Sequence, residues 1–264
     1  TLKAGIVLTT AERFGGNSYT FAIPEDITVP VLSTGFAYFD NIKVYEGTYI
    51  NQTFTVSSRN PNQKFILPNP GIDADLIRVV VKDNETSSVR DKYTKADSLF
   101  KVNSESMIWF LQEVENERYE IIFGDGIFGK ALVDGNVVEA SYIISNGSDA
   151  NGISNLAFAG KCTYNRNATE YTVTSGISLL TADTPSSGGQ SIESVDSVKK
   201  YAPQIYGTQN RALTSNDYEI LIPNKIYPET ESISVFGGEE LVPPQYGKVF
   251  ISIKPRTGDY VPNA

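Results

Sequence analysis

Apolar and polar positions alternate in many short stretches of the first 183 residues and again near the end of the chain. Side chains of a β-strand point to opposite faces in turn, so this period of two predicts half-buried antiparallel strands. The clearest stretches are 54–56, 119–123, 138–144, 171–173 and 249–253.

Two of these strands are expected to form hairpins with their neighbours. Trp109–Val114 and Tyr119–Phe123 are joined by the polar residues 115–118, which predicts a hairpin with Trp109 in the core. Asp134-Gly135-Asn136 has the residue types of a tight turn before the next strand.

The period changes after the stretch 184–190, Thr-Pro-Ser-Ser-Gly-Gly-Gln, which we interpret as a flexible module boundary. Apolar residues then recur every three or four positions from Ile192 to Ala202, as on one face of a helix. Ser191 is suited to cap the start of this helix, and Pro203 is expected to end it.

A second, shorter helix is predicted to begin at Thr214. Thr214 and Asp217 have the spacing of a capping box, with Asp in place of the usual Glu, and the helix should end before Pro223. Strands are expected to follow at 232–236 and 247–254.

The predicted fold class is therefore α+β and predominantly β, with antiparallel strands and hairpins and a small C-terminal helix-helix-strand-strand module. We expect a β-rich part at 1–83, a second β-rich part at 84–187 and the α+β module at 188–264. Whether the β-rich region is one domain or two stays open, with 69–71 and 82–98 as the candidate joints.

Composition narrows the possible chemistry. The 264 residues include no histidine and a single cysteine, Cys162, which excludes catalytic pairs or metal sites that need His or several thiolates. Cys162 is expected to be a buried or half-buried strand residue. The 31 acidic and 22 basic side chains give a formal charge of −9, which disfavours nucleic acid and anionic membranes as partners. No cofactor is predicted.

A glycine-rich loop at 123–131 matches phosphate-binding patterns in part. Gly124, Gly126 and Gly129 satisfy G-x-G-x-x-G, but such a loop binds phosphate only where it opens a helix, and the turn at 134–136 leaves no room for one. We therefore expect glycines that permit positive φ in a tight strand connection.

Carboxylate pairs could cleave a glycosidic bond without histidine. Each pair found in this sequence is more simply explained as solvated charge at a strand start, in a hairpin turn or in an exposed loop. The pairs are Asp73 with Asp75, Glu115 with Glu117, and Glu239 with Glu240.

Aromatic and polar residues cluster in Tyr201–Arg211, which we expect to be a long connection between the two helices. Tyr and Arg side chains in such a segment suit partner contact, although a packed loop would have the same composition. The candidate partner-contact residues are Tyr206, Gln209, Arg211, Phe236 and Tyr246.

Several ordered motifs then suggest a family. Gly188–Ser194, Thr208–Thr214 and Tyr246–Ile253, with Asp217-Tyr218 between the last two, resemble the J-like family of baseplate proteins of contractile-tailed bacteriophages. The run Phe123–Lys130 resembles the long T4-type members, which are wedge subunits of the inner baseplate ring.

The resemblance implies a non-enzymatic structural subunit that rearranges when the tail sheath contracts. Its implied partners are further copies of itself, as a dimer or in ring contacts, and other baseplate wedge proteins. It would be assembled in the host cytoplasm and reside in the virion tail baseplate. Because the chain starts at Thr1 and its one methionine is Met107, we expect a C-terminal piece of a longer subunit.

Two other functions stay open from the sequence. One is a receptor- or glycan-binding tail protein, which would gather exposed aromatic residues in a shallow pocket. The other is a carboxylate-dependent polysaccharide depolymerase, which would place two carboxylates about 5–10 Å apart in a groove.

Overall fold

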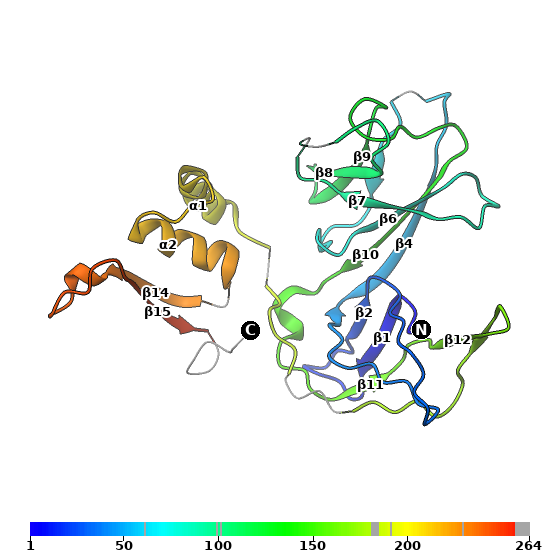
Figure 1. Cartoon of the computed structure of the whole chain (residues 1–264), viewed down its shortest axis with the longest axis horizontal. Coiled ribbons are helices and arrows are strands. Elements are labelled where there is room, and N and C mark those ends of the chain that lie inside the picture. Colours follow the sequence, from blue (N-terminus) through cyan, green and yellow to red (C-terminus); the bar gives the residue numbers. More distant parts are fainter. Residues whose placement is uncertain are drawn as a thin grey trace. The chain divides into compact units, whose positions relative to one another are not determined.

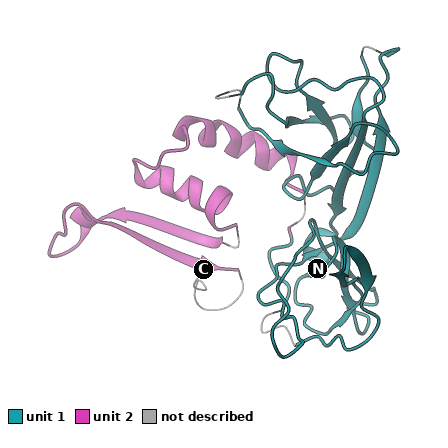
Figure 2. Ribbon diagram, turned by 45° about the vertical axis from the view of Figure 1, so that its right-hand side comes forward, with its two compact units in different colours: residues 1–189 teal, residues 190–264 magenta. Residues whose placement is uncertain are grey.

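The computed structural model describes residues 1–60, 62–98, 100, 102–180, 185–190, 192–228 and 230–256. The chain forms two compact units, unit 1 (Thr1–Gly189) and unit 2 (Gln190–Ala264), shown in Figure 2. Among the described residues, unit 1 consists mainly of strands and both α-helices belong to unit 2 (Figure 1). The predicted α+β class with a predominance of antiparallel strands is confirmed.

The larger sheet of unit 1 has seven strands in the order β4-β10-β6-β7-β8-β9-β5. Neighbouring strands are antiparallel except β7 and β8, where Thr94 lies beside Ile108 in a parallel register. This sheet takes strands from both sides of residue 83, and the three-part division of the chain stays a prediction. The strands are β4 (Thr48–Thr55), β5 (Phe65–Leu67), β6 (Arg78–Lys82), β7 (Asp91–Lys95), β8 (Ile108–Val114), β9 (Arg118–Phe123) and β10 (Val137–Ile144).

The core of this sheet forms because alternate side chains of each strand point to the same face. Trp109 is only 1% exposed, and its indole N–H donates to the carbonyl of Tyr93 at 3.2 Å. Phe54 of β4 meets Phe65 of β5 edge to face at 5.6 Å between ring centroids. Because β4 and β5 are the two end strands, this contact shows that the sheet curls around its own core.

The hairpin and turn expected around this core are confirmed. Strands β8 and β9 pair directly, with Trp109 opposite Phe123. In the loop that follows β9, Gly126 and Gly129 have φ of +87° and +94°, and no helix begins there. Gly126 and Gly129 thus serve a tight strand connection, as predicted, whereas Gly124 has no positive φ and instead lies close to the backbone of Gly129.

The smaller sheet of unit 1 has the order β11-β1-β2-β3 and a second core of its own. A third cluster, built on Ala22, Leu76 and Ile143, joins the two sheets. A separate pair, β12 and β13, lies near the end of the unit. The bounds are β1 (Gly5–Thr10), β2 (Thr20–Ile23), β3 (Tyr45–Glu46), β11 (Leu156–Phe158), β12 (Thr163–Arg166) and β13 (Thr169–Thr172), with a 3-10 turn η1 (Gly147–Ala150).

The segment expected to be a flexible boundary is anchored to unit 1 over part of its length. The backbone of Ser186 exchanges hydrogen bonds with Gly152 and Ile153, each at 2.8 Å. Asn151 donates to the carbonyl of Gly189 at 2.9 Å and accepts its N–H at 3.0 Å. Thr184 lies outside the described residues. The backbone groups of Ser186 and Gly189 are thus held by unit 1, and the flexibility of the stretch as a whole stays a prediction.

Unit 2 contains two helices and a strand pair. Its first helix differs from the sequence prediction: its N-cap is Ser194, whose side chain accepts from Ser197, whereas Ser191 lies outside the described residues. Pro203 lies inside the helix instead of ending it. Lys199, whose carbonyl would otherwise accept from residue 203, is exposed, so water can take the missing place. The elements are α1 (Val195–Thr208), α2 (Ser215–Leu221), a π-helical turn η2 (Ile222–Ile226), β14 (Thr230–Gly237), a 3-10 turn η3 (Gly238–Glu240) and β15 (Val249–Pro255).

The second helix begins as predicted. The Thr214 side chain accepts from the backbone of Asp217, and the Asp217 carboxylate accepts from the backbone of Thr214, which completes the capping box. The backbone N–H groups of Thr214 and then Leu213 hold the pKa of Asp217 below its ordinary value. Helix α2 ends at Leu221, before Pro223. None of the helices in the described ranges combines the length and apolar character of a membrane span.

Candidate interaction surface

Unit 2 buries few apolar side chains. Among the described residues, only Ile220, Leu221, Ile222 and Val235 of unit 2 belong to the buried hydrophobic set, and the three core clusters lie in unit 1. The large hydrophobic residues that unit 2 leaves exposed, called here the open apolar set, come from α1, η2, β15 and the segments that connect the elements. They are Ile192, Val195, Val198, Tyr206, Leu213, Ile226, Val242, Tyr246, Val249 and Ile251.

Three of the five predicted contact residues lie at the end of α1. Tyr206 is 86% exposed, and its carbonyl accepts from the N–H of Gln209, the C-cap residue with φ of +48°. The Gln209 side chain accepts in turn from the Arg211 guanidinium at 2.8 Å. The segment Tyr201–Thr208 is helical, so the expectation of a long connection there is wrong, and the connection is only Gln209–Thr214.

The other two predicted residues lie on different elements. Phe236 is half-buried in β14, where its ring stacks on Phe250 of β15 at 5.6 Å and 10° between planes. Tyr246 is 80% exposed in the loop before β15. The structure thus brings Gln209 and Arg211 together and gives Phe236 an internal partner. Partner contact by these five residues stays a prediction.

Sequence reasoning missed most of the open apolar set. Val242 is 99% exposed in a loop, and Leu213 is 78% exposed between the helices. An apolar residue between two predicted elements was the signal available for both. Val195 and Val198 belong to the apolar face predicted for the first helix, and they are 68% and 43% exposed. Periodicity identifies such a face but does not say what covers it.

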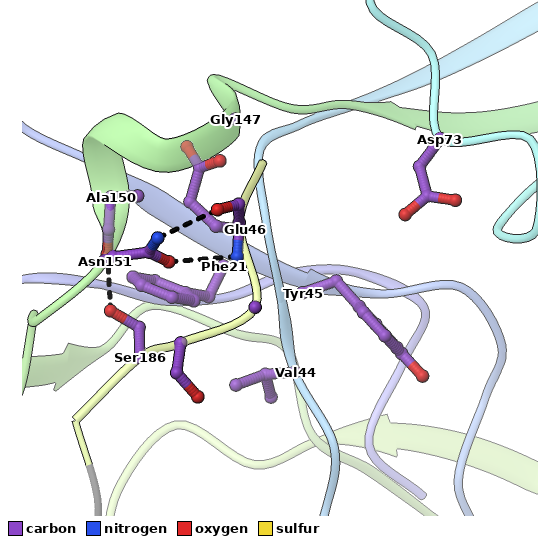
Figure 3. A pocket seen from close by; sticks show the side chains of 12 residues that line it. Phe21, Val44, Tyr45, Glu46, Asp73, Gly147, Ala150, Asn151 and Ser186 are labelled. Carbon is purple, nitrogen blue, oxygen red and sulfur yellow. Dashed lines mark hydrogen bonds between the residues drawn. The ribbon is translucent and has the colours of Figure 1, made fainter. Parts of the chain in front are cut away.

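The cavity drawn in Figure 3 belongs to unit 1 and measures about 190 Å³. Its carboxylates are Glu46 and Asp73, beside Phe21 and Tyr45. Both oxygens of Glu46 accept hydrogen bonds from Asn146, the shorter at 2.6 Å from its side-chain amide. Glu46 therefore fastens the loop after β10, and the segment 186–189 closes one side of the cavity.

The acidic pairs considered for catalysis have structural surroundings. Asp73 and Asp75 lie in a turn before β6 and not at a strand start, because the Asp73 carboxylate accepts the N–H of Asp75 at 3.0 Å. Glu115 and Glu117 lie in the hairpin turn between β8 and β9, as expected. Glu239 and Glu240 lie exposed in η3.

Two remaining candidate groups also have simple explanations. Cys162 is half-buried in a bridge to Leu2, and burial raises the pKa of its thiol, which opposes thiolate reactivity. In the glycine loop, Asp125 accepts the N–H groups of Phe128 and Ile127 at 2.8 and 2.9 Å. A carboxylate at the amides of the loop occupies the place that a phosphate would need. No three His, Cys, Asp or Glu side chains in the described ranges gather as ligands for a metal ion.

Comparison with known proteins shows similarity to phage baseplate proteins. The family described as "Baseplate structural protein gp6, C-terminal domain I" matches residues 214–264, which lie within unit 2. "Baseplate wedge protein gp6" of Enterobacteria phage T4 is 22% identical over 260 residues. This match covers 93% of the present chain and 37% of that protein, so the chain spans little more than a third of the relative's length. The broader J-like relationship stays a prediction.

Proposed function

We propose that this chain is part of a structural subunit of a contractile phage tail baseplate, resident in the virion as a baseplate wedge protein. The similarity to a T4 wedge protein over 93% of the chain, with a separate family match in unit 2, supports this proposal. The structural observation that carries it is the small buried apolar core of unit 2 together with its open apolar set, which a neighbouring protein could cover.

The physical argument rests on the shortage of core in unit 2. A unit of 75 residues buries a smaller fraction of its surface than a larger domain, and it depends on dense apolar packing to be stable alone. Unit 2 instead exposes Leu213, Ile226 and Val242 by more than two thirds. A neighbouring protein that covers these side chains would contribute about 25 cal/mol for each Å² of apolar surface removed from water.

The same surface suggests which contacts the subunit makes in the baseplate. Unit 2 makes contacts between wedges in the inner ring around the tail hub, with other copies of this chain and with other wedge proteins. Assembly takes place in the host cytoplasm, and the contacts rearrange when the sheath contracts. The described polar groups around the cavity of unit 1 hold loops together, which favours a structural role over a catalytic one.

Incorporation into wedges tests this proposal. Wedges assembled without their gp6-type subunit are mixed with the purified chain, and bound chain is measured by sedimentation. The variants Leu213→Asp and Val242→Asp should each reduce binding about tenfold or more, since a charge replaces apolar contact. The matched control is Val89→Asp, at a residue of unit 1 that is 61% exposed, and it should bind like the parent.

Equal binding by all three variants would contradict the role of unit 2. Rearrangement is tested separately, by comparing chemical cross-links from Lys225 and Lys248 in extended and contracted tails. Identical cross-link sets in the two states would show that the contacts of unit 2 do not change on contraction.

A further inference from the structure

The strand pair of unit 2 has two different edges. At the β14 edge, the backbone N–H of Val235 donates to the Glu219 carboxylate of α2 at 3.1 Å. At the end of the pair, the N–H of Gly238 donates to the carbonyl of Lys248 at 2.8 Å. Opposed residues in an antiparallel pair alternate between pairs that are hydrogen-bonded to each other and pairs that are not. Counting from the bonded pair Gly238 and Lys248, Val235 and Ile251 form a non-hydrogen-bonded pair, which agrees with the bond from Val235 to Glu219.

The consequence for β15 is a free row of backbone groups. If Ile251 is not bonded to β14, its N–H and C=O point away from the pair, and those of Val249 and Ile253 do the same. No strand or side chain among the described residues pairs with this edge. Helix α2 protects the β14 edge through Glu219, whereas no residue that the structure describes covers the β15 edge in this way.

The β15 edge also lacks the usual charge protection. Proteins commonly place lysines or other charges on an exposed edge to prevent pairing with another chain. Between Val249 and Pro255 the only charged residue is Lys254, and it is neutralised by Glu231 at 2.7 Å. Val249 and Ile251 are 49% and 43% exposed along the same strand. This edge is therefore suited to accept a strand from Val249 to Ile253, and Pro255, which has no N–H, ends it.

We propose that β15 pairs antiparallel with β15 of a second copy of this chain, about a two-fold axis at Ser252. This deepens the proposed function, on whose self-association it rests. The two-fold places Ile251 of each copy opposite Ile253 of the other, and both residues carry outward backbone groups. Ser252 then lies opposite Ser252 of the other copy as a non-bonded pair.

The occupant is a second copy because the strand is complementary to itself. In this register the apolar side chains of Ile251 and Ile253 continue one face across four strands. Phe250 comes opposite Lys254 of the other copy, a favourable cation and aromatic pair. A pairing centred at Ile251 would instead place Lys248 opposite Lys254, which like charge disfavours.

Cysteine cross-linking tests the pairing in the full chain. Non-bonded opposed residues have Cα atoms about 4.5 Å apart, within the range of about 4.4–6.8 Å that a disulfide spans. Ser252→Cys in a Cys162→Ser background should form a disulfide-linked dimer on oxidation. Ser234→Cys in the same background is the matched control, since Ser234 lies opposite Ser252 within one chain and away from the free edge.

A charge swap keeps the test independent of cysteine chemistry. Ser252→Lys should weaken self-association about tenfold, because it places two like charges opposite each other. Ser252→Glu should do the same alone, and an equimolar mixture of the two variants should restore association. Ser234→Lys should leave association unchanged.

Failure of the mixture to restore association, together with no dimer from Ser252→Cys, overturns the pairing. If the chain still joins wedges in that case, the proposed function stands and only this interface is wrong. If Ser252→Lys blocks wedge binding without changing self-association, the edge receives a strand of another protein, which also overturns the inference.

Discussion

Trp109 of unit 1 is 1% exposed and Val242 of unit 2 is 99% exposed, and these two residues illustrate how differently the units use apolar side chains. In unit 1, strands of two sheets enclose three connected core clusters. In unit 2, two helices and a strand pair enclose little more than Ile220, Leu221, Ile222 and Val235. Unit 1 therefore has extensive apolar burial of its own, whereas unit 2 has little, which is the basis of our proposal that a partner covers unit 2.

The largest expected effect comes from the core of unit 1. Trp109→Ala should reduce the free energy of unfolding of unit 1 by about 3–5 kcal/mol, because it removes a fully buried ring and leaves a cavity. Denaturant titration followed by circular dichroism measures this. Val242→Ala is the control in unit 2 and should stay within about 0.5 kcal/mol of the parent. A comparable loss in both variants would erase the contrast between the units.

Detachment of the segment that leads from unit 1 to unit 2 should have the next largest effect. Gly189→Ala would place a Cβ 2.2 Å from the carbonyl oxygen of Gly147, so residues 186–189 must move away from Asn151. We expect cleavage by a nonspecific protease within 185–190 to become several-fold faster, because opened segments are cut preferentially. Ser187→Ala, at a neighbouring exposed residue, should be cut at the parental rate. Equal rates for both variants would show that the anchoring is not significant.

A smaller effect is expected at the start of α2. Thr214→Ala removes the N-cap acceptor of the capping box and should reduce the free energy of unfolding of unit 2 by about 1 kcal/mol. Loss of helical circular dichroism on heating measures it. Ser215→Ala, at the first helical residue, leaves the capping bonds in place. The transition of unit 1 should not shift, and a shift would indicate that the two units unfold together.

The smallest effect is a pH dependence of unit 1. Burial alone would raise the pKa of Glu25, but bonds from Lys92 and Arg78 more than offset it and hold this pKa below its ordinary value. A lowered pKa in the folded state means that the stabilisation is present above the ordinary value, about 4.3, and is lost as pH falls through the folded value. Since these groups are partly exposed, the change should be below about 1 kcal/mol. Glu25→Gln should reduce the loss of stability between pH 5 and 3 without abolishing it, because other carboxylates of unit 1, such as Asp26, also have a lowered pKa. An unchanged profile would contradict this assignment.

Local patterns predicted much of the fold. Alternation predicted β10, and the spacing of Thr214 and Asp217 predicted the start of α2, because both signals depend on contacts within a few residues. The prediction for Pro203 was wrong because an exposed helix can lose one backbone bond to water. The parallel register of β7 and β8 was not predicted, since it depends on a connection of 12 residues whose path is set by packing.

The candidate surface was predicted only in part. Tyr206 and Tyr246 were chosen for residue type and are highly exposed. Phe236 was chosen for the same reason, but it stacks on Phe250 within the strand pair. Ile251 was assigned to a strand, yet nothing in its neighbourhood in the sequence shows that β15 ends the sheet. Residue type indicates what can make a contact, and only the fold shows which contacts are already made.

The sequence by itself determined several of the strands, the start of α2 and the absence of histidine chemistry, and its resemblance leads to a phage baseplate. These features depend on side-chain period, local capping and residue inventory, which are properties of neighbouring positions. Only the tertiary structure decided that Asn151 holds Gly189, that Glu219 covers the β14 edge and that β15 is open. Each of these features involves groups from separate elements. Only the folded chain brings those elements together, so only the fold decides which backbone groups have a hydrogen-bond partner.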